Sequence, residues 1–117
     1  MQKLDYIYNA TILSAYDGDT LKVMIDLGLG VFHKTAVRLG GIDTPEMRGG
    51  TPESKAAAVL ARDFTRKFVG EEAVVVTLKD KTGKYGRYVA IVYPSSGGGK
   101  SLNDLLVDAG HAVIKRW

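Results

Sequence analysis

The stretch that decides the fold is residues 17–41, DGDTLKVMIDLGLGVFHKTAVRLGG. Its first half alternates apolar and other residues with the period of a half-buried strand, and the apolar positions are Leu21, Val23, Ile25 and Leu27. After a loop over residues 27–30, a second strand pattern carries Thr35, Val37 and Leu39 on one face and Lys34, Ala36 and Arg38 on the other. Gly40-Gly41 then favours a bulge. The stretch predicts two consecutive strands.

Further strands are predicted on both sides of this stretch. Residues 6–15 are rich in Tyr, Ile, Thr and Leu, and Asp17-Gly18 is a typical hairpin turn into the next strand. Residues 73–78 and 88–93 are two more strand-like runs, separated by the turn-like residues 81–86. Residues 95–99, SSGGG, are predicted to form a surface loop.

Two helices are predicted from capping signals. Thr51, Pro52 and Glu53 are typical of an N-cap, a first helical position and a first-turn acid. The apolar positions that follow keep helical spacing until Gly70, and they are Ala57, Leu60, Ala61, Phe64 and Phe68. Ser101 with Asp104 resembles a capping box, and the apolar face of this second helix is Leu102, Leu105, Leu106 and Ala109, with Gly110 ending it.

The resulting order, β-β-β-α-β-β-α, predicts a mainly β protein with helices (α+β). We expect residues 1–117 to form one domain, a five-stranded Greek-key OB-fold barrel with one helix between strands three and four and a short C-terminal helix. An α+β roll with the same element order is the alternative. The glycine content, 14 of 117 residues, favours a small barrel with sharply bent strands.

Composition excludes several classes of protein. A length of 117 residues is too short for a two-domain enzyme. The lack of cysteine excludes disulfide frameworks, thiol nucleophiles, cysteine-ligated zinc and iron–sulfur clusters, so any metal would be held by oxygen or histidine. The net charge of +3 permits a polyanionic partner without identifying one.

No apolar run approaches the length of a membrane span, and residues 1–15 lack the charged and apolar regions of a signal peptide. We therefore expect a soluble chain without a membrane partner. If Met1 is native, the protein stays in the compartment where it is made, although a trimmed, secreted form would look the same.

Acids and arginines gather in three short stretches, DGDT at 17–20, RLGGIDTPE at 38–46 and KYGR at 84–87. Asp19 is in register with the buried face of its strand, where a carboxylate is costly unless it is paired or binds a cation. Pro45 fixes the loop that carries Asp43 and Glu46, so these two acids and Arg38 are expected to share a pocket, although an Asx turn is an alternative for this loop.

Two hard carboxylates with carbonyl and water oxygens suit calcium or magnesium better than zinc. His33 and His111 are isolated and are expected to be ordinary surface or packing residues.

Taken together, the three stretches resemble the staphylococcal nuclease (thermonuclease) family over about Thr11 to Ile114. The resemblance implies an OB-fold barrel and calcium-dependent hydrolysis of DNA and RNA that cuts the bond to the 5′ oxygen and leaves 3′-phosphates. It also implies DNA and RNA as substrates, and we expect the chain to be a monomer.

The resemblance assigns a role to each motif residue. Asp19, Asp43 and the carbonyl of Thr44 would bind the calcium ion, and Glu46 would orient or deprotonate the attacking water. Arg38 and Arg87 would hold the phosphate oxygens. Lys84 and Tyr85 would contact the terminal nucleotide, and Asp17 and Thr20 would support the cluster.

Two departures from the family pattern concern substrate contacts. The loop from Met47 to Pro52 is shorter than in the staphylococcal enzyme and carries one basic residue, and Arg116 replaces a base-stacking tyrosine, with Trp117 beside it. Two other functions stay open: a catalytically silent OB-fold module that binds nucleic acid or protein, and a structural barrel whose acids pair with Arg38 and Arg87.

Overall fold

The computed structural model describes residues 6–48, 50–82 and 88–115. Five strands close into a barrel in the order β1-β2-β3-β6-β5; their bounds are β1 Tyr6–Asp17, β2 Thr20–Gly28, β3 Val31–Leu39, β5 Glu72–Thr82 and β6 Tyr88–Pro94. All neighbouring strands are antiparallel except β3 and β6, which pair in parallel. The prediction of a mainly β protein with two helices is confirmed.

Smaller elements complete the chain. β4 (Ile42–Asp43) pairs with β7 (Val113–Ile114) in a separate two-stranded sheet, which the sequence analysis did not predict. Helix α1 spans Pro52–Arg66, helix α2 spans Leu102–Asp108, and a single 3₁₀ turn, η2, spans Ser95–Gly97 within the predicted surface loop. In the part of the chain described here, no helix has the length and apolar character needed to cross a membrane.

Two predicted turns differ in detail. The two-residue turn between β1 and β2 is Gly18-Asp19, not Asp17-Gly18, because Asp17 pairs with Thr20 and extends β1 to that point. Asp19 therefore lies in the turn rather than at the start of β2. Gly40-Gly41 forms a turn between β3 and β4 rather than a bulge, with Gly41 at a φ of 75° that glycine adopts readily.

The barrel interior is filled by the alternate residues that the strand patterns predicted, except that Leu27, near the end of β2, is 49% exposed. Fully buried side chains come from every barrel strand, and α2 adds two leucines to the same core cluster; they include Ile12, Val23, Val37, Val75, Val92, Leu102 and Leu106. Burial of one such side chain stabilises the fold by about 1.5–3 kcal/mol. This core fixes the start of β2 and the end of β3, which carry parts of the charged motifs at 17–20 and 38–46.

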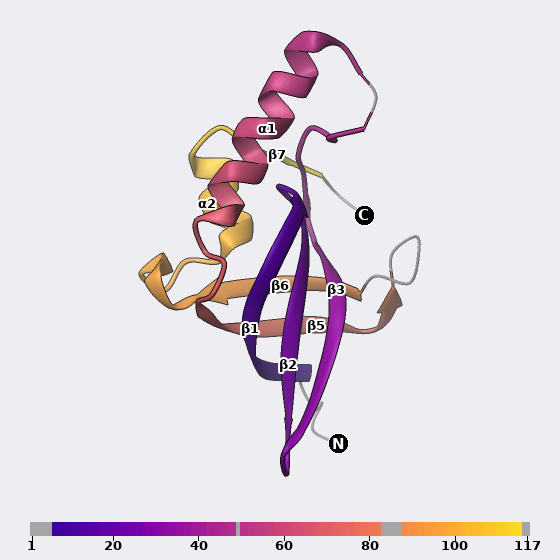
Figure 1. The fold of residues 1–117 in the computed structure, drawn as a ribbon, viewed down its shortest axis with the longest axis vertical. Coiled ribbons are helices and arrows are strands. Elements are labelled where there is room, and N and C mark those ends of the chain that lie inside the picture. Colours follow the sequence, from indigo (N-terminus) through magenta and orange to yellow (C-terminus); the bar gives the residue numbers. More distant parts are fainter. Residues whose placement is uncertain (1–5, 49, 83–87, 116–117) are drawn as a thin grey trace.

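Helix α1 lies across the end of the barrel at which β1 meets β2 (Figure 1). Thr51 is its N-cap and forms a capping box with Ser54, as the capping signal predicted in part. The predicted apolar face is wrong at Leu60, which is exposed, because the helix instead buries a face of small residues, Ala58, Ala61 and Thr65. Small side chains allow the helix to approach the β1–β2 turn closely.

Candidate functional site

The turn that carries Asp19 is attached to helix α1 by buried contacts. The hydroxyl of Thr65 donates a hydrogen bond of 2.6 Å to the carbonyl of Gly18, and Thr65 is fully buried. A Cβ atom on Gly18 would lie 2.9 Å from the Cβ of Ala61, so only glycine fits there without a shift of the helix or the turn. Two residues of α1 that are distant in sequence, Ala61 and Thr65, therefore hold the turn that carries Asp19.

Arg38 joins the two acids that the motifs singled out. Its Nη1 lies 3.0 Å from Oδ2 of Asp19, and its Nη2 lies 3.1 Å from Oδ1 of Asp43. Nη1 also donates to the carbonyls of Leu39 (2.7 Å) and Ile42 (3.2 Å). A planar guanidinium can hold these partners at once, whereas a lysine ammonium cannot reproduce the fork. The structure thus brings Asp19, Arg38 and Asp43 together.

Two hydrogen bonds from backbone amides to aspartate side chains fasten the loop after β4 to the end of β1 and to the β1–β2 turn. The amide of Thr44 donates to Oδ2 of Asp19 at 3.1 Å, and the amide of Met47 donates to Oδ1 of Asp17 at 3.0 Å. Thr20 donates to Oδ1 of Asp19 at 3.3 Å. Asp17, expected only to support the cluster, therefore fixes the segment that carries Glu46.

Burial makes the ionised form of Asp19 less favourable. Only 7% of its side chain is exposed. Burial raises its pKa above the ordinary value of 3.8, against the opposing effects of Arg38 and of the hydrogen bond from the Thr44 amide, and Asp43 raises it further. Asp43 is more open to solvent, with 40% of its side chain exposed. The site thus combines one buried and one accessible carboxylate beside one arginine.

Two residues that the sequence analysis did not single out support this arrangement. Lys115 places its Nζ 3.9 Å from Oδ2 of Asp43, next to the pairing of β4 with β7. Buried Asn103 donates to the carbonyl of Gly40 (2.9 Å) and accepts from the amide of Val92 (3.2 Å). No local pattern marks either residue, because both act through contacts between distant segments.

The other predicted residues lie as follows. Glu46 is exposed and, within the described ranges, its carboxylate has no hydrogen bond or ion pair. Lys84, Tyr85 and Arg87 lie outside the described residues, as does Trp117. His33 is exposed on β3, and the ring of His111 packs on Phe64 at a centroid distance of 5.1 Å.

The atoms near Asp19 and Asp43 bear on whether a hard cation such as calcium could bind here. The Thr44 side chain is buried, and its hydroxyl Oγ1 lies close enough to the buried carboxylate of Asp19 to influence its pKa. All donors at this point are oxygens, the atoms that calcium prefers. Within the described residues no three His, Cys, Asp or Glu side chains cluster as a metal group, so a metal here would depend on two carboxylates with backbone and solvent oxygens.

Comparison with known protein families bears on these residues directly. The family model described as staphylococcal nuclease homologue matches residues 36–117, more than two thirds of the chain. The match contains Arg38, Asp43, Thr44 and Glu46, and it begins after the turn that carries Asp19. The expected family resemblance is confirmed: the chain belongs to the family of staphylococcal nuclease homologues.

Proposed function

We propose that this protein is a calcium-dependent, sugar-nonspecific nuclease that hydrolyses phosphodiester bonds in DNA and RNA and leaves 3′-phosphates. Family membership indicates a nuclease-type function. The observation that carries the finer proposal is the cluster of Asp19, Arg38 and Asp43, which buried contacts hold at one end of the barrel. Such preorganised charge is the usual basis of phosphoryl-transfer catalysis.

In this proposal, Asp19, Asp43 and the carbonyl of Thr44 bind calcium. The bound ion would supply positive charge for the phosphate oxygens and lower the pKa of a coordinated water. Glu46 is exposed on the loop that Asp17 fastens through the Met47 amide. It can therefore accept a proton from water, or orient that water, without giving up a contact within the described structure.

Arg38 and Arg87 are proposed to bind the phosphate whose bond is cut. Only 11% of the Arg38 side chain is exposed, and the carbonyls of Leu39 and Ile42 hold its guanidinium, so little conformational entropy is lost when it meets a phosphate. Lys84 and Tyr85 are proposed to contact the terminal nucleotide. These assignments come from the motif positions, because residues 83–87 lie outside the described structure.

We also assign the barrel to the OB type. Its strand order β1-β2-β3-β6-β5, the parallel pairing of β3 with β6 and the position of α1 between β4 and β5 support this assignment. The match to the staphylococcal nuclease homologue family, whose resemblance implied such a barrel, is independent support.

The experiment is cleavage of a 5′-labelled oligonucleotide by the purified full chain, with calcium or with EDTA. We expect cleavage in calcium alone, and products whose gel mobility changes after phosphatase removes a 3′-phosphate. Asp19→Ala should first raise the calcium concentration needed, whereas Glu46→Ser should lower turnover by orders of magnitude at saturating calcium. Cleavage that persists in EDTA, or products ending in a 3′-hydroxyl, would contradict the proposal.

One observation favours a second function, that of a structural barrel whose acids pair with its arginines. Arg38 is paired with both Asp19 and Asp43 inside the protein, as expected if these charges served the fold alone. In that case Asp43→Ala would reduce stability, and neither the wild type nor the variant would cleave nucleic acid. A cleaving wild type with a stable, inactive Asp43→Ala variant excludes this alternative.

A further inference from the structure

The outer face of the β2–β3 hairpin continues directly from the proposed site. Leu21 and Val37 point into the core, so their neighbours point outward, because side chains alternate along a strand. Thr20 pairs with Arg38, and Lys22 pairs with Ala36 one step further from the turn. Two residues along a strand span about 7 Å. Lys22 is therefore the next outward cation after Arg38 along this hairpin.

A hollow of about 360 Å³ lies over this step of the hairpin. Its walls include Thr20, Lys22 and Ala36 from the hairpin, Tyr16 from β1 and Arg66 from the last turn of α1. Two lining residues are cations and none is an acid. Arg66 Nε donates to the carbonyl of Ala15 at 3.3 Å, which anchors the guanidinium at the edge of the hollow. Thr20, which lines the hollow, donates a hydrogen bond to Asp19.

Tyr16 is the aromatic residue of this hollow. It is 60% exposed, although it lies on a barrel strand next to the buried Asp17. An exposed aromatic ring beside cations is the pattern of a single-stranded nucleic-acid groove, where bases stack on rings and phosphates meet Lys and Arg. Its position next to the proposed cleavage site favours a substrate strand over an unrelated ligand.

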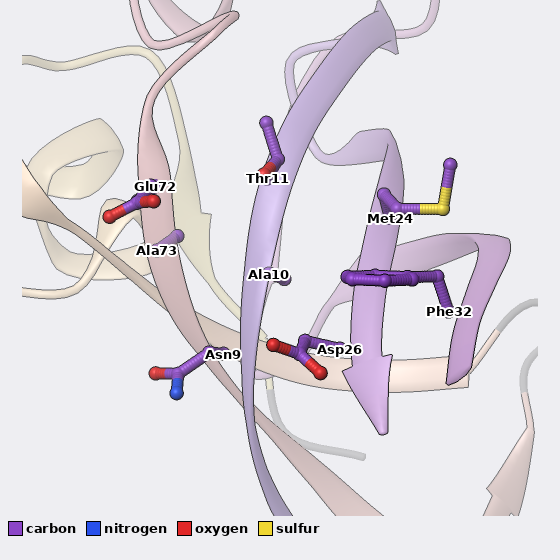
Figure 2. Close-up of a pocket in the computed structure, with 8 residues that line it drawn as sticks. All are labelled: Asn9, Ala10, Thr11, Met24, Asp26, Phe32, Glu72 and Ala73. Atoms are coloured by element: carbon purple, nitrogen blue, oxygen red, sulfur yellow. The ribbon is translucent and has the colours of Figure 1, made fainter. Parts of the chain in front are cut away.

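A second hollow, further from the β1–β2 turn on the same hairpin, is lined by residues of the opposite charge. It has a volume of about 350 Å³, and Figure 2 shows Asp26, Phe32 and Met24 around it, with Glu72 on β5. Two of its lining residues are acids and none is a cation. Its aromatic residue, Phe32, is 61% exposed, almost the same fraction as Tyr16. A polyanion would be repelled there, so this hollow serves as an internal control.

We propose that the hollow at Tyr16, Lys22 and Arg66 binds the part of a single-stranded polynucleotide that extends away from the scissile phosphate. A base stacks on Tyr16, and Lys22 and Arg66 contact successive phosphates. This proposal rests on the proposed nucleic-acid substrate, but it requires only binding and not cleavage.

The test is binding of a fluorescent dodecamer of oligothymidylate with phosphorothioate linkages, in calcium, at a series of salt concentrations. Lys22→Ala should reduce the slope of log affinity against log salt by about 0.7, and adding Arg66→Gln should double that reduction. Tyr16→Ala should weaken binding about 5- to 150-fold, as loss of one stacked base predicts. Phe32→Ala and Lys100→Ala should change neither quantity, because they remove an equally exposed ring and a cation that pairs with Asp108 and does not line this hollow.

Lys22 and Tyr16 are exposed strand residues, so their variants are expected to fold, and thermal denaturation checks this. Equal affinities and slopes for Tyr16→Ala, Lys22→Ala and wild type would overturn the proposal, as would a wild type that does not bind. Cleavage of unmodified plasmid is measured separately. A wild type that binds through Tyr16 and Lys22 but does not cleave would refute the nuclease proposal and support this one.

Discussion

Gly18→Ala tests whether the close approach of helix α1 positions the turn that carries Asp19. Gly18 has no positive φ, so alanine is compatible with its backbone and only the added methyl group matters. That Cβ would lie 2.9 Å from Ala61 Cβ and 3.1 Å from the Ala61 carbonyl carbon. Carbon atoms pack best at about 3.5–4.0 Å, so the helix or the turn must move by several tenths of an ångström.

The expected cost is that of overpacking a core, about 1–3 kcal/mol of the free energy of unfolding. This is less than the total stability of an ordinary domain, about 5–15 kcal/mol, so the variant still folds. Ala61→Gly alone should cost about 2 kcal/mol, because it lowers helix propensity and removes a buried methyl group. In the double variant the nearest clash is gone, so its cost should be smaller than the sum of the two single costs.

Urea denaturation of the four proteins gives this coupling, and the m-value checks that each unfolds in the same two-state manner. We expect a coupling of at least about 0.5 kcal/mol, the lower end for residues in contact. We also expect Gly18→Ala to lose cleavage activity and the double variant to regain part of it. Additive costs within about 0.3 kcal/mol would refute the idea that this contact positions the turn.

Three further predictions follow from the same contacts. Burial raises the pKa of Asp19, so the folded protein binds a proton at this carboxylate more tightly than the unfolded chain does. The free energy of unfolding of wild type, relative to that of Asp19→Asn, should therefore fall as pH rises from about 3.8 through the raised pKa. Urea denaturation of both proteins without calcium measures this difference, and a difference that increases with pH would contradict the prediction. Asn103→Ala leaves the buried carbonyl of Gly40 and the buried amide of Val92 without this partner. The free energy of unfolding should fall by about 1–3 kcal/mol, which lowers the urea midpoint. An unchanged midpoint would count against a stabilising role of Asn103. Calcium at about 100 times its dissociation constant should stabilise wild type by about 2.7 kcal/mol and raise its midpoint of thermal denaturation. The same calcium concentration should change the midpoint of Asp43→Asn little. Equal calcium-induced shifts in the two proteins would exclude Asp43 as a ligand.

Local signals in the sequence predicted the elements well, because their causes are local. The alternation at Leu21, Val23 and Ile25 is the pleat of β2 itself, and the Thr51 cap is a hydrogen bond to a residue three positions away. Arg38 was predicted to share a pocket with Asp43 and Glu46, because Pro45 fixes the loop that carries both acids. In the structure Arg38 contacts Asp43 and also Asp19, whereas the exposed Glu46 makes no hydrogen bond or ion pair within the described residues. The register of Thr20 opposite Arg38 accounts for the contact with Asp19.

The features that were missed depend on contacts between distant segments. Helical spacing identified the apolar residues of α1 but not which face of the helix packs on the barrel. Because Ala61 packs against Gly18, Leu60 points toward solvent. The pairing of β4 with β7, which brings Lys115 to Asp43, joins residues about seventy positions apart along the chain. Two-residue strands carry no periodic pattern that could predict such a pairing.

Plasmid nicking by the full chain, in calcium and in EDTA, tests the central claim most directly. The account predicts conversion of supercoiled DNA to nicked and linear forms in calcium, none in EDTA, and a rate lower by orders of magnitude for Arg38→Lys, which retains the charge but loses the fork that joins Asp19 to Asp43. Intact plasmid in calcium with folded wild-type protein, or an Arg38→Lys rate equal to that of wild type, would contradict it.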